Sequence, residues 1–233
     1  MDLTPRLRCV ASLVPREARL ADVGTDHGYL PVLLLREGRI RSAIAADLRS
    51  GPLDRARQTA LRYGLEDAIS FRLCDGLSGI QAHEADTIVI AGMGGETIAG
   101  ILEHCPWADG GAHLFLLQPM SSLPDLRVRL GALGFCILRE VLVSEGKKYY
   151  VVLAVQAGPM PPLTLGEQWA GRQTPGMVQP LRGAYLTQLL ERLDRALAGM
   201  VRGDAASAPE LARLRETGRQ LSDMKEEWEQ WQR

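Results

Sequence analysis

Leu20-Ala-Asp-Val-Gly-Thr-Asp-His-Gly-Tyr29 is the stretch that decides the fold. An apolar run ends in Asp-x-Gly, a second glycine follows, and Leu30-Pro-Val-Leu-Leu-Leu35 has the composition of a helix. This order predicts a strand, a tight glycine turn and a helix N-terminus. Because glycine lacks a Cβ and tolerates positive φ, such a turn lets a nucleotide-like ligand approach the backbone. An ordinary strand–helix connection has the same pattern, so further features are needed to choose between the two.

The spacing of this turn departs from the dinucleotide pattern G-x-G-x-x-G. Gly24 and Gly28 enclose Asp26, so a carboxylate stands where S-adenosylmethionine sites often have their middle glycine. An anion there disfavours a pyrophosphate at close range, because like charges repel, and it tolerates a cationic sulfonium. The turn therefore favours S-adenosylmethionine over a dinucleotide.

The composition limits the class of protein. A chain of 233 residues suits one medium domain with an appendage, or two small domains, and 27 Lys and Arg against 28 Asp and Glu do not by themselves indicate a nucleic-acid partner. The four cysteines stand far apart, which indicates reduced core thiols rather than disulfides or a zinc site. Without a membrane-length apolar run or a signal-peptide pattern, we expect a soluble cytoplasmic protein with no metal and no membrane partner.

Four further apolar runs predict buried strands that alternate with helices, at residues 42–47, 69–74, 85–91 and 113–118. Asp47 ends the first of them about twenty residues past the glycine turn, where an acid can accept hydrogen bonds from ribose hydroxyls. The alternative is an aspartate at a helix N-terminus, but Gly51 and Pro52 separate Asp47 from the helix expected at 53–63.

Two further strand ends carry glycines. Asp75-Gly76 follows the run at 69–74 and could hold an adenine amino group, although Asp-Gly is also a common turn. Gly92-Met-Gly-Gly95 follows the run at 85–91. One glycine would suffice for a turn before the helix expected at 96–103, so three indicate that the backbone must make room for another group.

The pattern changes after residue 135. Two strands at 136–144 and 149–155 are separated by only four residues, which permits an antiparallel hairpin and excludes a parallel crossover. Five β/α units that finish in a hairpin predict an α/β fold with a Rossmann-like, mostly parallel sheet of seven strands whose last strand is antiparallel, as in class I methyltransferases. We assign residues 1–157 to this catalytic domain.

Residues 158–233 form the second predicted part, a linker followed by a helical hairpin. Leucines recur at spacings of three and four from 180 to 202, and apolar residues recur again after a polar break at 203–209. This pattern predicts two antiparallel helices with a coiled-coil seam. Their arginines alternate with acids, which is typical of a solvated surface but also suits an arm that grips a large substrate.

Several segments stand out: residues 21–31, Ala45-Ala-Asp47 with Gly51-Pro-Leu53, Asp75-Gly-Leu77, Ile90-Ala-Gly-Met-Gly-Gly95, Leu117-Gln-Pro119 and Glu145-Gly-Lys-Lys-Tyr149. Among them, the Asp-x-Gly-x-Asp-His and Gly-Met-Gly-Gly pieces are specific in combination. Through these segments the chain resembles the bacterial tRNA adenine-N1 methyltransferases that act at adenine 22, over nearly its whole length. The resemblance implies a Rossmann-like domain with a coiled-coil hairpin, S-adenosylmethionine as cofactor and tRNA as substrate. Met120 departs from the family, in which asparagine is expected after Gln-Pro.

The resemblance and the strand-end positions together give the expected site. Asp26 would accept a hydrogen bond from the N6 amino group of the target adenine or remove a proton after methylation, with His27 orienting it. The expected cofactor-binding residues are Gly24, Thr25, Gly28, Asp47, Asp75, Gly76 and Gly92. The expected substrate-binding residues are Tyr29, Met93, Gln118 and Arg6. His27 and Tyr29 could equally be structural, and arginines near the N-terminus and on the hairpin are candidates for phosphate contacts.

Two other functions remain open. A nicotinamide-dependent oxidoreductase also has a glycine turn and a ribose-binding acid, but Asp26 and the terminal hairpin argue against it. A non-catalytic tRNA-binding protein with a vestigial pocket is the second alternative, and the polar groups at successive strand ends argue against that. The sequence does not imply an oligomeric state, and a monomer is compatible with it.

Overall fold

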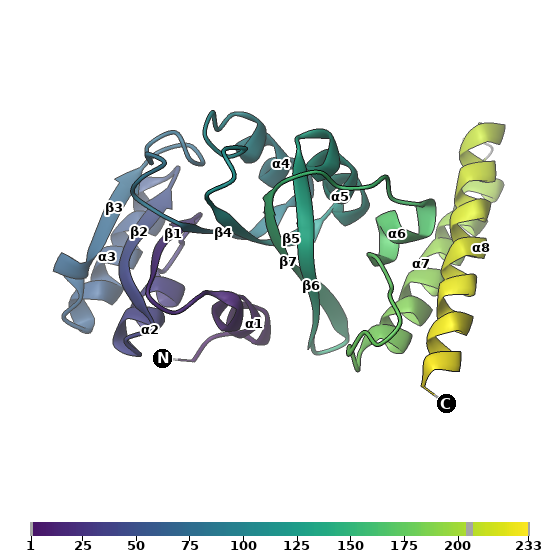
Figure 1. The fold of residues 1–233 in the computed structure, drawn as a ribbon, viewed down its shortest axis with the longest axis horizontal. Helices are drawn as coiled ribbons and strands as arrows, with labels where there is room; N and C mark the ends of the chain where they lie inside the picture. Colours follow the sequence, from purple (N-terminus) through teal and green to yellow (C-terminus); the bar gives the residue numbers. More distant parts are fainter. Residues whose placement is uncertain (1, 204–206, 233) are drawn as a thin grey trace. The chain divides into compact units, whose positions relative to one another are not determined.

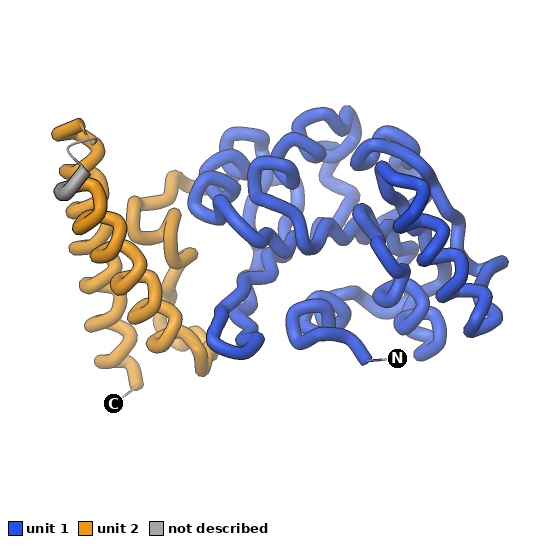
Figure 2. The backbone as a smooth tube through the Cα atoms, turned by 180° about the vertical axis from the view of Figure 1, so that it is seen from behind, with its two compact units in different colours: residues 1–160 blue, residues 161–233 orange. Residues whose placement is uncertain are grey.

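The computed structural model describes residues 2–203 and 207–232, and the chain divides into two compact units, Met1–Met160 and Pro161–Arg233 (Figure 2). The helices of the first unit are α1 (Pro5–Leu13), α2 (Tyr29–Arg36), α3 (Ser50–Arg62), the short 3₁₀ helix η1 (Glu66–Ala68), α4 (Gly95–Glu103) and α5 (Leu123–Ala132). Its strands are β1 (Ala18–Val23), β2 (Ile40–Asp47), β3 (Ile69–Leu73), β4 (Thr87–Gly94), β5 (Leu114–Ser121), β6 (Phe135–Glu145) and β7 (Lys148–Ala157).

The seven strands form one sheet in the order β3-β2-β1-β4-β5-β7-β6 (Figure 1). Neighbouring pairs from β3 to β5 are parallel, whereas β7 is antiparallel to both β5 and β6. The pairing of β6 with β7 continues to Glu145 and Lys148, so a tight turn joins them, as the short connection requires. The predicted fold class is therefore confirmed, including the antiparallel last strand.

The direction of the strand order reverses between β1 and β4. From β1 the chain moves outward through β2 to β3, and then it returns to β4 and moves the other way through β5. Because β-α-β crossovers are right-handed, the two directions place their helices on opposite faces of the sheet. Thus α1, α2 and α3 pack in a row on one face, and α4 and α5 pack together on the other. Ligands of such sheets bind at this reversal.

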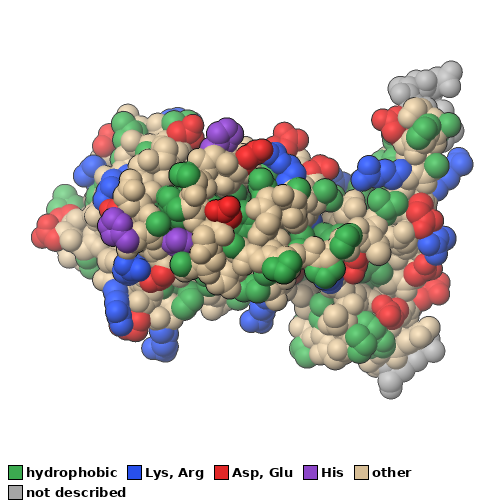
Figure 3. Space-filling view, turned by 45° about the horizontal axis from the view of Figure 1, so that its top comes forward, with side chains coloured by type: hydrophobic (Ala, Val, Ile, Leu, Met, Phe, Trp, Pro, Cys, Tyr) green, Lys and Arg blue, Asp and Glu red, His purple; other side chains and the backbone are tan. Residues whose placement is uncertain are grey.

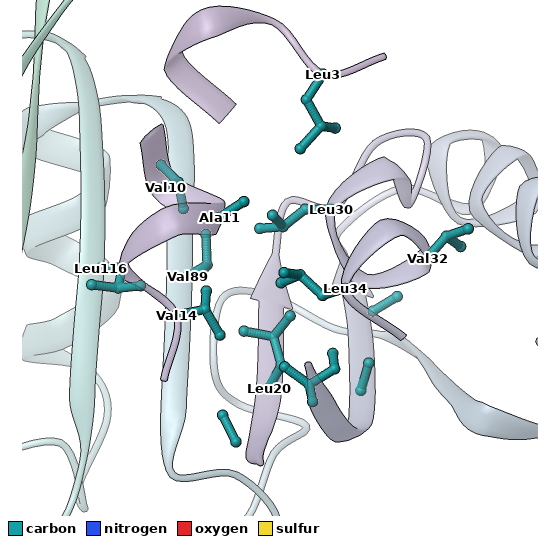
Figure 4. Close-up of a cluster of buried hydrophobic side chains, with 14 of the residues drawn as sticks. Leu3, Val10, Ala11, Val14, Leu20, Leu30, Val32, Leu34, Val89 and Leu116 are labelled. Carbon is teal, nitrogen blue, oxygen red and sulfur yellow. The ribbon is translucent and has the colours of Figure 1, made fainter. Parts of the chain in front are cut away.

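A hydrophobic cluster holds α1 and α2 on the sheet (Figure 4). Val10 of α1 and Leu34 of α2 are buried against Leu20, Val89 and Leu116, which come from β1, β4 and β5. Burying one such side chain is worth about 1.5–3 kcal/mol. The cluster therefore fixes both helices on the strands whose carboxyl ends meet at the reversal.

Three element boundaries differ by three residues from the sequence expectation. Helix α3 begins at Ser50 rather than residue 53, because Pro52 is tolerated in a first turn, where its missing N–H would have had no helical partner. Strands β4 and β5 continue to Gly94 and Ser121, three residues beyond the predicted ends. The pairing passes through Pro119 at register shifts, which is where a strand can accept proline.

The second unit contains α6 (Leu165–Ala170), α7 (Arg182–Gly203) and α8 (Ala208–Trp231). A Cβ added at Gly183 would lie 3.4 Å from Trp228, and one added at Gly218 would lie 3.0 Å from Leu193, so α7 and α8 pack antiparallel. The helical hairpin is confirmed, with a buried seam that includes Leu186, Leu193, Leu221 and Trp228. Residues 204–206 of the predicted polar break lie outside the described residues.

Helix α6 was not expected from the sequence. Its signal is the pair Thr164 and Glu167, which form a reciprocal capping box at its N-terminus. The helix is only six residues long, so it shows too little hydrophobic periodicity to be found by that criterion.

Acidic and basic side chains are interspersed over the second unit (Figure 3). Arg219, for example, pairs with Glu216 at 2.6 Å and with Asp223 at 2.7 Å, one turn away in each direction along α8. This pattern agrees with a solvated helix surface. Among the described residues, the structure shows no helix with the length and apolar character needed to cross a membrane.

Candidate active site

A cavity of about 870 Å³ lies at the carboxyl ends of β1 to β4, on the edge of the sheet where the strand order reverses. That volume is within the usual range for small-molecule sites. The predicted site residues that line the cavity are Arg6, Gly24, Thr25, Asp26, His27, Tyr29, Asp47, Asp75, Gly76, Gly92 and Met93. Gly28 and Gln118 are absent from its lining. The turn and the strand ends that the sequence singled out are thus brought together.

Asp22, at the end of β1, is a cavity residue that the sequence expectations missed. Its carboxylate is buried and accepts a hydrogen bond from Thr25 Oγ1 at 2.7 Å. Burial raises its pKa from 3.8 to about 6; the Thr25 bond opposes this rise, and the nearby Asp47 carboxylate adds to it. Asp22 is therefore a carboxylic acid whose pKa lies well above that of an ordinary aspartate. Its position in the Asp-x-Gly pattern was the sequence feature that could have identified it as a site residue.

The backbone of the turn is fixed to β2. The N–H groups of Gly24 and Thr25 both donate to the carbonyl of Ala46, at 2.8 and 3.1 Å. Gly24 has a φ of 74°, and a Cβ added there would lie 2.2 Å from the Met93 methyl group. The missing side chain of Gly24 thus makes room for the Met93 methyl group between the ends of β1 and β4.

Asp26 and His27 form the rim of the cavity. Asp26 Oδ1 accepts a hydrogen bond from Arg55 Nη2 at 2.7 Å, and Asp26 Oδ2 lies 3.6 Å from His27 Nε2. The His27 ring stacks on Tyr29 with centroids 5.1 Å apart. Asp26 itself has a φ of 50°, a left-handed conformation that aspartate tolerates better than most residues. The turn therefore presents a carboxylate, an imidazole and a phenol side by side.

Gly28 has a different environment from the one expected of a cofactor ligand. It lies outside the cavity lining, has a φ of 66°, and a Cβ added there would lie 3.0 Å from the Cβ of Ala56. Its missing side chain allows α3 to approach the turn closely. The structure therefore gives Gly28 a packing reason that local sequence could not reveal.

Asp47 and Asp75 stand at the ends of β2 and β3. Asp47 is buried, and its Oδ1 accepts a hydrogen bond from the backbone N–H of Arg49, the residue before α3. The early start of α3 thus removes the argument that Gly51 and Pro52 separate Asp47 from a helix. Asp47 lines the cavity and also accepts a backbone hydrogen bond beside the helix N-terminus.

The ends of β4 and β5 are shaped by two bulges. Ala91 pairs with Gln118 and Met93 with Pro119, so Gly92 is an extra residue on β4, and Gly94 pairs with Ser121, so Met120 is extra on β5. Gly92, Met93 and Met120 all line the cavity. Bulges are frequent next to active sites because they redirect side chains. Here they give the cavity a wall with two methionine side chains.

The glycines after β4's predicted end make room mainly for the protein itself. A Cβ added at Gly95 would lie 2.6 Å from the carbonyl oxygen of Ser122 and 2.9 Å from that of Ser121. Gly92 instead has a φ of 81° and lies at the cavity. The prediction that the backbone must make room for another group therefore has two explanations: Gly95 makes room for the backbone of the chain itself, and Gly92 borders the cavity.

Arg6, which lines the cavity, and Gln118 belong to one network of contacts. Arg6 Nη1 donates to Gln118 Oε1 at 3.0 Å, Arg6 Nε lies 3.3 Å from Glu145 Oε2, and the guanidinium lies over the Tyr150 ring. Gln118 is fully buried and donates to the Pro119 carbonyl at 2.9 Å. These contacts tie α1 to β5 and to the β6–β7 hairpin.

The chemistry of the cavity fits S-adenosylmethionine. Carboxylates at the ends of β1, β2 and β3 can accept hydrogen bonds from hydroxyl and amino groups, and their negative charge suits a sulfonium. Gly24 brings backbone without a side chain to the cavity lining, and only the flexible end of Met93 lies within 4 Å of the place where its Cβ would be. In the described part of the chain, no three His, Cys, Asp or Glu side chains are grouped so that they could hold a metal ion.

Comparison with known proteins identifies similar sequences. The protein family described as "Methyltransferase domain" matches residues 3–153. A curated relative, the tRNA (adenine(22)-N(1))-methyltransferase of Bacillus subtilis strain 168, is 38% identical over 158 residues. The aligned part is 68% of this chain and 66% of the Bacillus protein, just under two thirds of its length.

Solved structures extend the similarity to nearly the whole chain. Sp1610 of Streptococcus pneumoniae, a candidate tRNA (m1A22) methyltransferase, is 33% identical with a TM-score of 0.83, and the match covers 96% of this chain and 100% of that one. It is also known in complex with S-adenosyl-L-methionine. The m1A22 tRNA methyltransferase TrmK of B. subtilis is 30% identical with a TM-score of 0.76, covering 99% of this chain and 98% of that one.

Proposed function

This chain belongs to the S-adenosylmethionine-dependent methyltransferases, in the family that modifies adenine 22 of tRNA, and we propose that it transfers a methyl group to N1 of that adenine. The observation that carries the proposal is the cavity at the strand reversal, with a carboxylate at the end of each of three adjacent strands and Asp26 on its rim. Such an enzyme would act in the cytoplasm, on tRNA.

The cofactor side of the cavity would be formed by Asp22, Asp47 and Asp75. Asp47 stands where a strand-end acid accepts hydrogen bonds from ribose hydroxyls. Gly24 would allow close approach of the cofactor to the β1 turn. S-adenosylmethionine, when bound, supplies an electrophilic methyl group on a cationic sulfur.

The substrate side would be formed by Tyr29, Met93 and Met120, with Asp26 beside them. N1 of adenine carries a lone pair, so the protein does not need a strong base to create the nucleophile. Its task is alignment, which can contribute several kcal/mol to a rate. N1 lies on the Watson–Crick edge, so the base must be unpaired or flipped to enter the cavity.

Asp26 would accept a hydrogen bond from the N6 amino group, or take the proton that becomes more acidic when N1 is methylated. Its half-exposed carboxylate at the cavity rim supports this role. Asp26→Asn is a suitable test, because asparagine also tolerates the left-handed backbone at this position. We expect it to lower kcat by about 100-fold or more. Wild-type turnover in this variant would remove Asp26 from the mechanism.

Incubation of the protein with labelled S-adenosylmethionine and unmodified tRNA, followed by nucleoside mapping, tests the whole proposal. We expect 1-methyladenosine at position 22. Absence of label in tRNA would favour a non-catalytic binding protein. Calorimetry with S-adenosylmethionine and with NAD separates the methyltransferase from an oxidoreductase, since the Asp26 carboxylate at the turn disfavours a pyrophosphate and tolerates a sulfonium.

Arginines of the helical hairpin are proposed contacts for tRNA phosphates. Replacing the exposed Arg195 and Arg215 with alanine should make the salt dependence of tRNA binding less steep. With fewer phosphate contacts, binding releases fewer counterions from the tRNA. Arg219→Ala is the matched control, since Glu216 and Asp223 already offset its charge. Equal slopes in wild type and the double variant would exclude this role.

A further inference from the structure

Arg55 is the partner of Asp26 and lies in none of the segments that indicated the site from sequence. It is on the exposed side of α3, 29 residues along the chain, and its Nη2 donates to Asp26 Oδ1 at 2.7 Å. Roughly half of each side chain is open to solvent. An exposed ion pair of this kind contributes little to stability, so its place beside the cavity is the reason to consider a functional role.

Packing of α3 against the glycine turn explains how the pair forms. A Cβ at Gly28 would lie 3.0 Å from the side chain and 3.2 Å from the Cα of Ala56, the residue next to Arg55. The absence of that Cβ lets α3 come close enough for Arg55 to reach Asp26. The turn and the helix are thus built to bring these two side chains together.

The two oxygens of the Asp26 carboxylate have different surroundings. Oδ1 is hydrogen-bonded to Arg55, whereas Oδ2 lies 3.6 Å from His27 Nε2, beyond hydrogen-bonding distance. A carboxylate that could rotate would offer either oxygen to a substrate. With Oδ1 taken, Oδ2 is the oxygen that remains on the side of His27 and Tyr29.

We infer that Arg55 is a positioning residue for methyl transfer, which holds Asp26 by Oδ1 and directs Oδ2 to the N6 amino group of the target adenine. The inference rests on the proposed function. A phosphate contact is the competing role for an exposed arginine. However, a guanidinium that already neutralises a carboxylate at 2.7 Å attracts a phosphate less than a solvated one does.

Kinetics of Arg55→Ala test the inference. We expect kcat at saturating tRNA and S-adenosylmethionine to fall by about 10- to 100-fold, as for a misplaced reacting group, with KM for tRNA within twofold of wild type. Arg55→Lys should recover part of the lost kcat, and millimolar guanidinium ion should recover part of it in Arg55→Ala. The thermal unfolding midpoint should stay near that of wild type.

Arg57→Ala is the matched control, because it removes the same charge from the same helix. The Arg57 guanidinium lies over the Phe71 ring, 4.6 Å from its centroid, rather than at the cavity. We expect its kcat to match wild type. If Arg55→Ala and Arg57→Ala both raise KM for tRNA and leave kcat unchanged, Arg55 is a phosphate contact and the inference is overturned.

A double variant shows whether Arg55 acts through Asp26. In an Asp26→Asn background, Arg55→Ala should change kcat by less than twofold, because the group that it positions is already gone. Fully multiplicative losses would overturn the inference while leaving the proposed function intact. A wild-type protein that makes no 1-methyladenosine would instead overturn the proposed function, and the positioning role would fall with it.

Discussion

Two glycine-containing segments border the same cavity, and their glycines serve different purposes. In the turn from Asp22 to Gly28, Gly24 has a positive φ, and an added Cβ there would meet the flexible end of the Met93 side chain. In the segment that starts α4, an added Cβ at Gly95 would meet backbone carbonyl oxygens. A Cβ added at Gly24 would meet the end of a side chain that can move, whereas a Cβ added at Gly95 would meet backbone that cannot. The difference predicts that substitutions in the first affect function most, and those in the second affect folding.

Gly95→Ala gives the largest expected change in stability. Its Cβ would lie 2.6 and 2.9 Å from two carbonyl oxygens, and a backbone cannot move aside as a side chain can. We expect the free energy of unfolding to fall by more than about 3 kcal/mol, measured by urea denaturation. A loss below about 1 kcal/mol would show that the start of α4 is not packed as tightly as described.

Asp22→Asn tests how much the buried carboxylate of Asp22 lowers the free energy of unfolding. Burial raises the pKa of Asp22 in the folded protein from 3.8 to about 6, so the unfolded chain ionises this group first as pH rises. Ionisation of Asp22 therefore lowers stability between about pH 4 and pH 6, by at most about 3 kcal/mol at about 1.4 kcal/mol per pKa unit. The asparagine variant should lack that decline and be more stable than wild type at pH 7.

The comparison in this experiment is the difference between variant and wild-type stability across pH 4 to 7. Asp54→Asn, at an exposed position of α3, serves as the control and should leave the wild-type profile nearly unchanged. A constant difference between Asp22→Asn and wild type at every pH would mean that Asp22 is not desolvated. If the variant is more stable but binds S-adenosylmethionine less tightly, Asp22 lowers stability and contributes to cofactor binding.

Gly24→Ala should have a smaller effect on folding than on binding. A non-glycine residue at a φ of 74° costs roughly 1–2 kcal/mol, and the methyl group of Met93 can move away. Calorimetry should show a loss of S-adenosylmethionine affinity, because the added Cβ and the displaced end of Met93 would narrow the cavity. A destabilisation as large as that of Gly95→Ala would contradict the difference that we infer between the two segments.

Gly100→Ala is the smallest change and the matched control for Gly95. Both glycines are in α4, but a Cβ at Gly100 would have no neighbouring atom within 4 Å and its φ is not positive. The substitution should raise the free energy of unfolding by about 0.4–1 kcal/mol, because alanine reduces the freedom of the unfolded chain. Destabilisation of similar size at both positions would show that the close contacts at Gly95 are not its cause, since alanine has a higher helix propensity than glycine.

Local patterns were sufficient where neighbours in sequence decide the structure. The apolar runs predicted the strands of the sheet, and the four residues between the last two runs predicted the antiparallel hairpin, because a short link cannot cross over. The same patterns misplaced the start of α3 and the ends of β4 and β5. The ends of β4 and β5 depend on pairing between Met93 and Pro119, which are far apart in the chain.

The amino-acid sequence by itself determined the fold class, the helical hairpin and the polar strand ends, because periodicity and loop length are local properties of the chain. Only the tertiary structure decided that Gly28 makes room for α3, that Gly95 makes room for backbone, that Asp22 is desolvated and that Arg55 holds Asp26. Each of these depends on atoms brought together from separate strands and helices. Close approach, burial and charge pairing are properties of the packed molecule, which residue types and spacing along one segment do not encode.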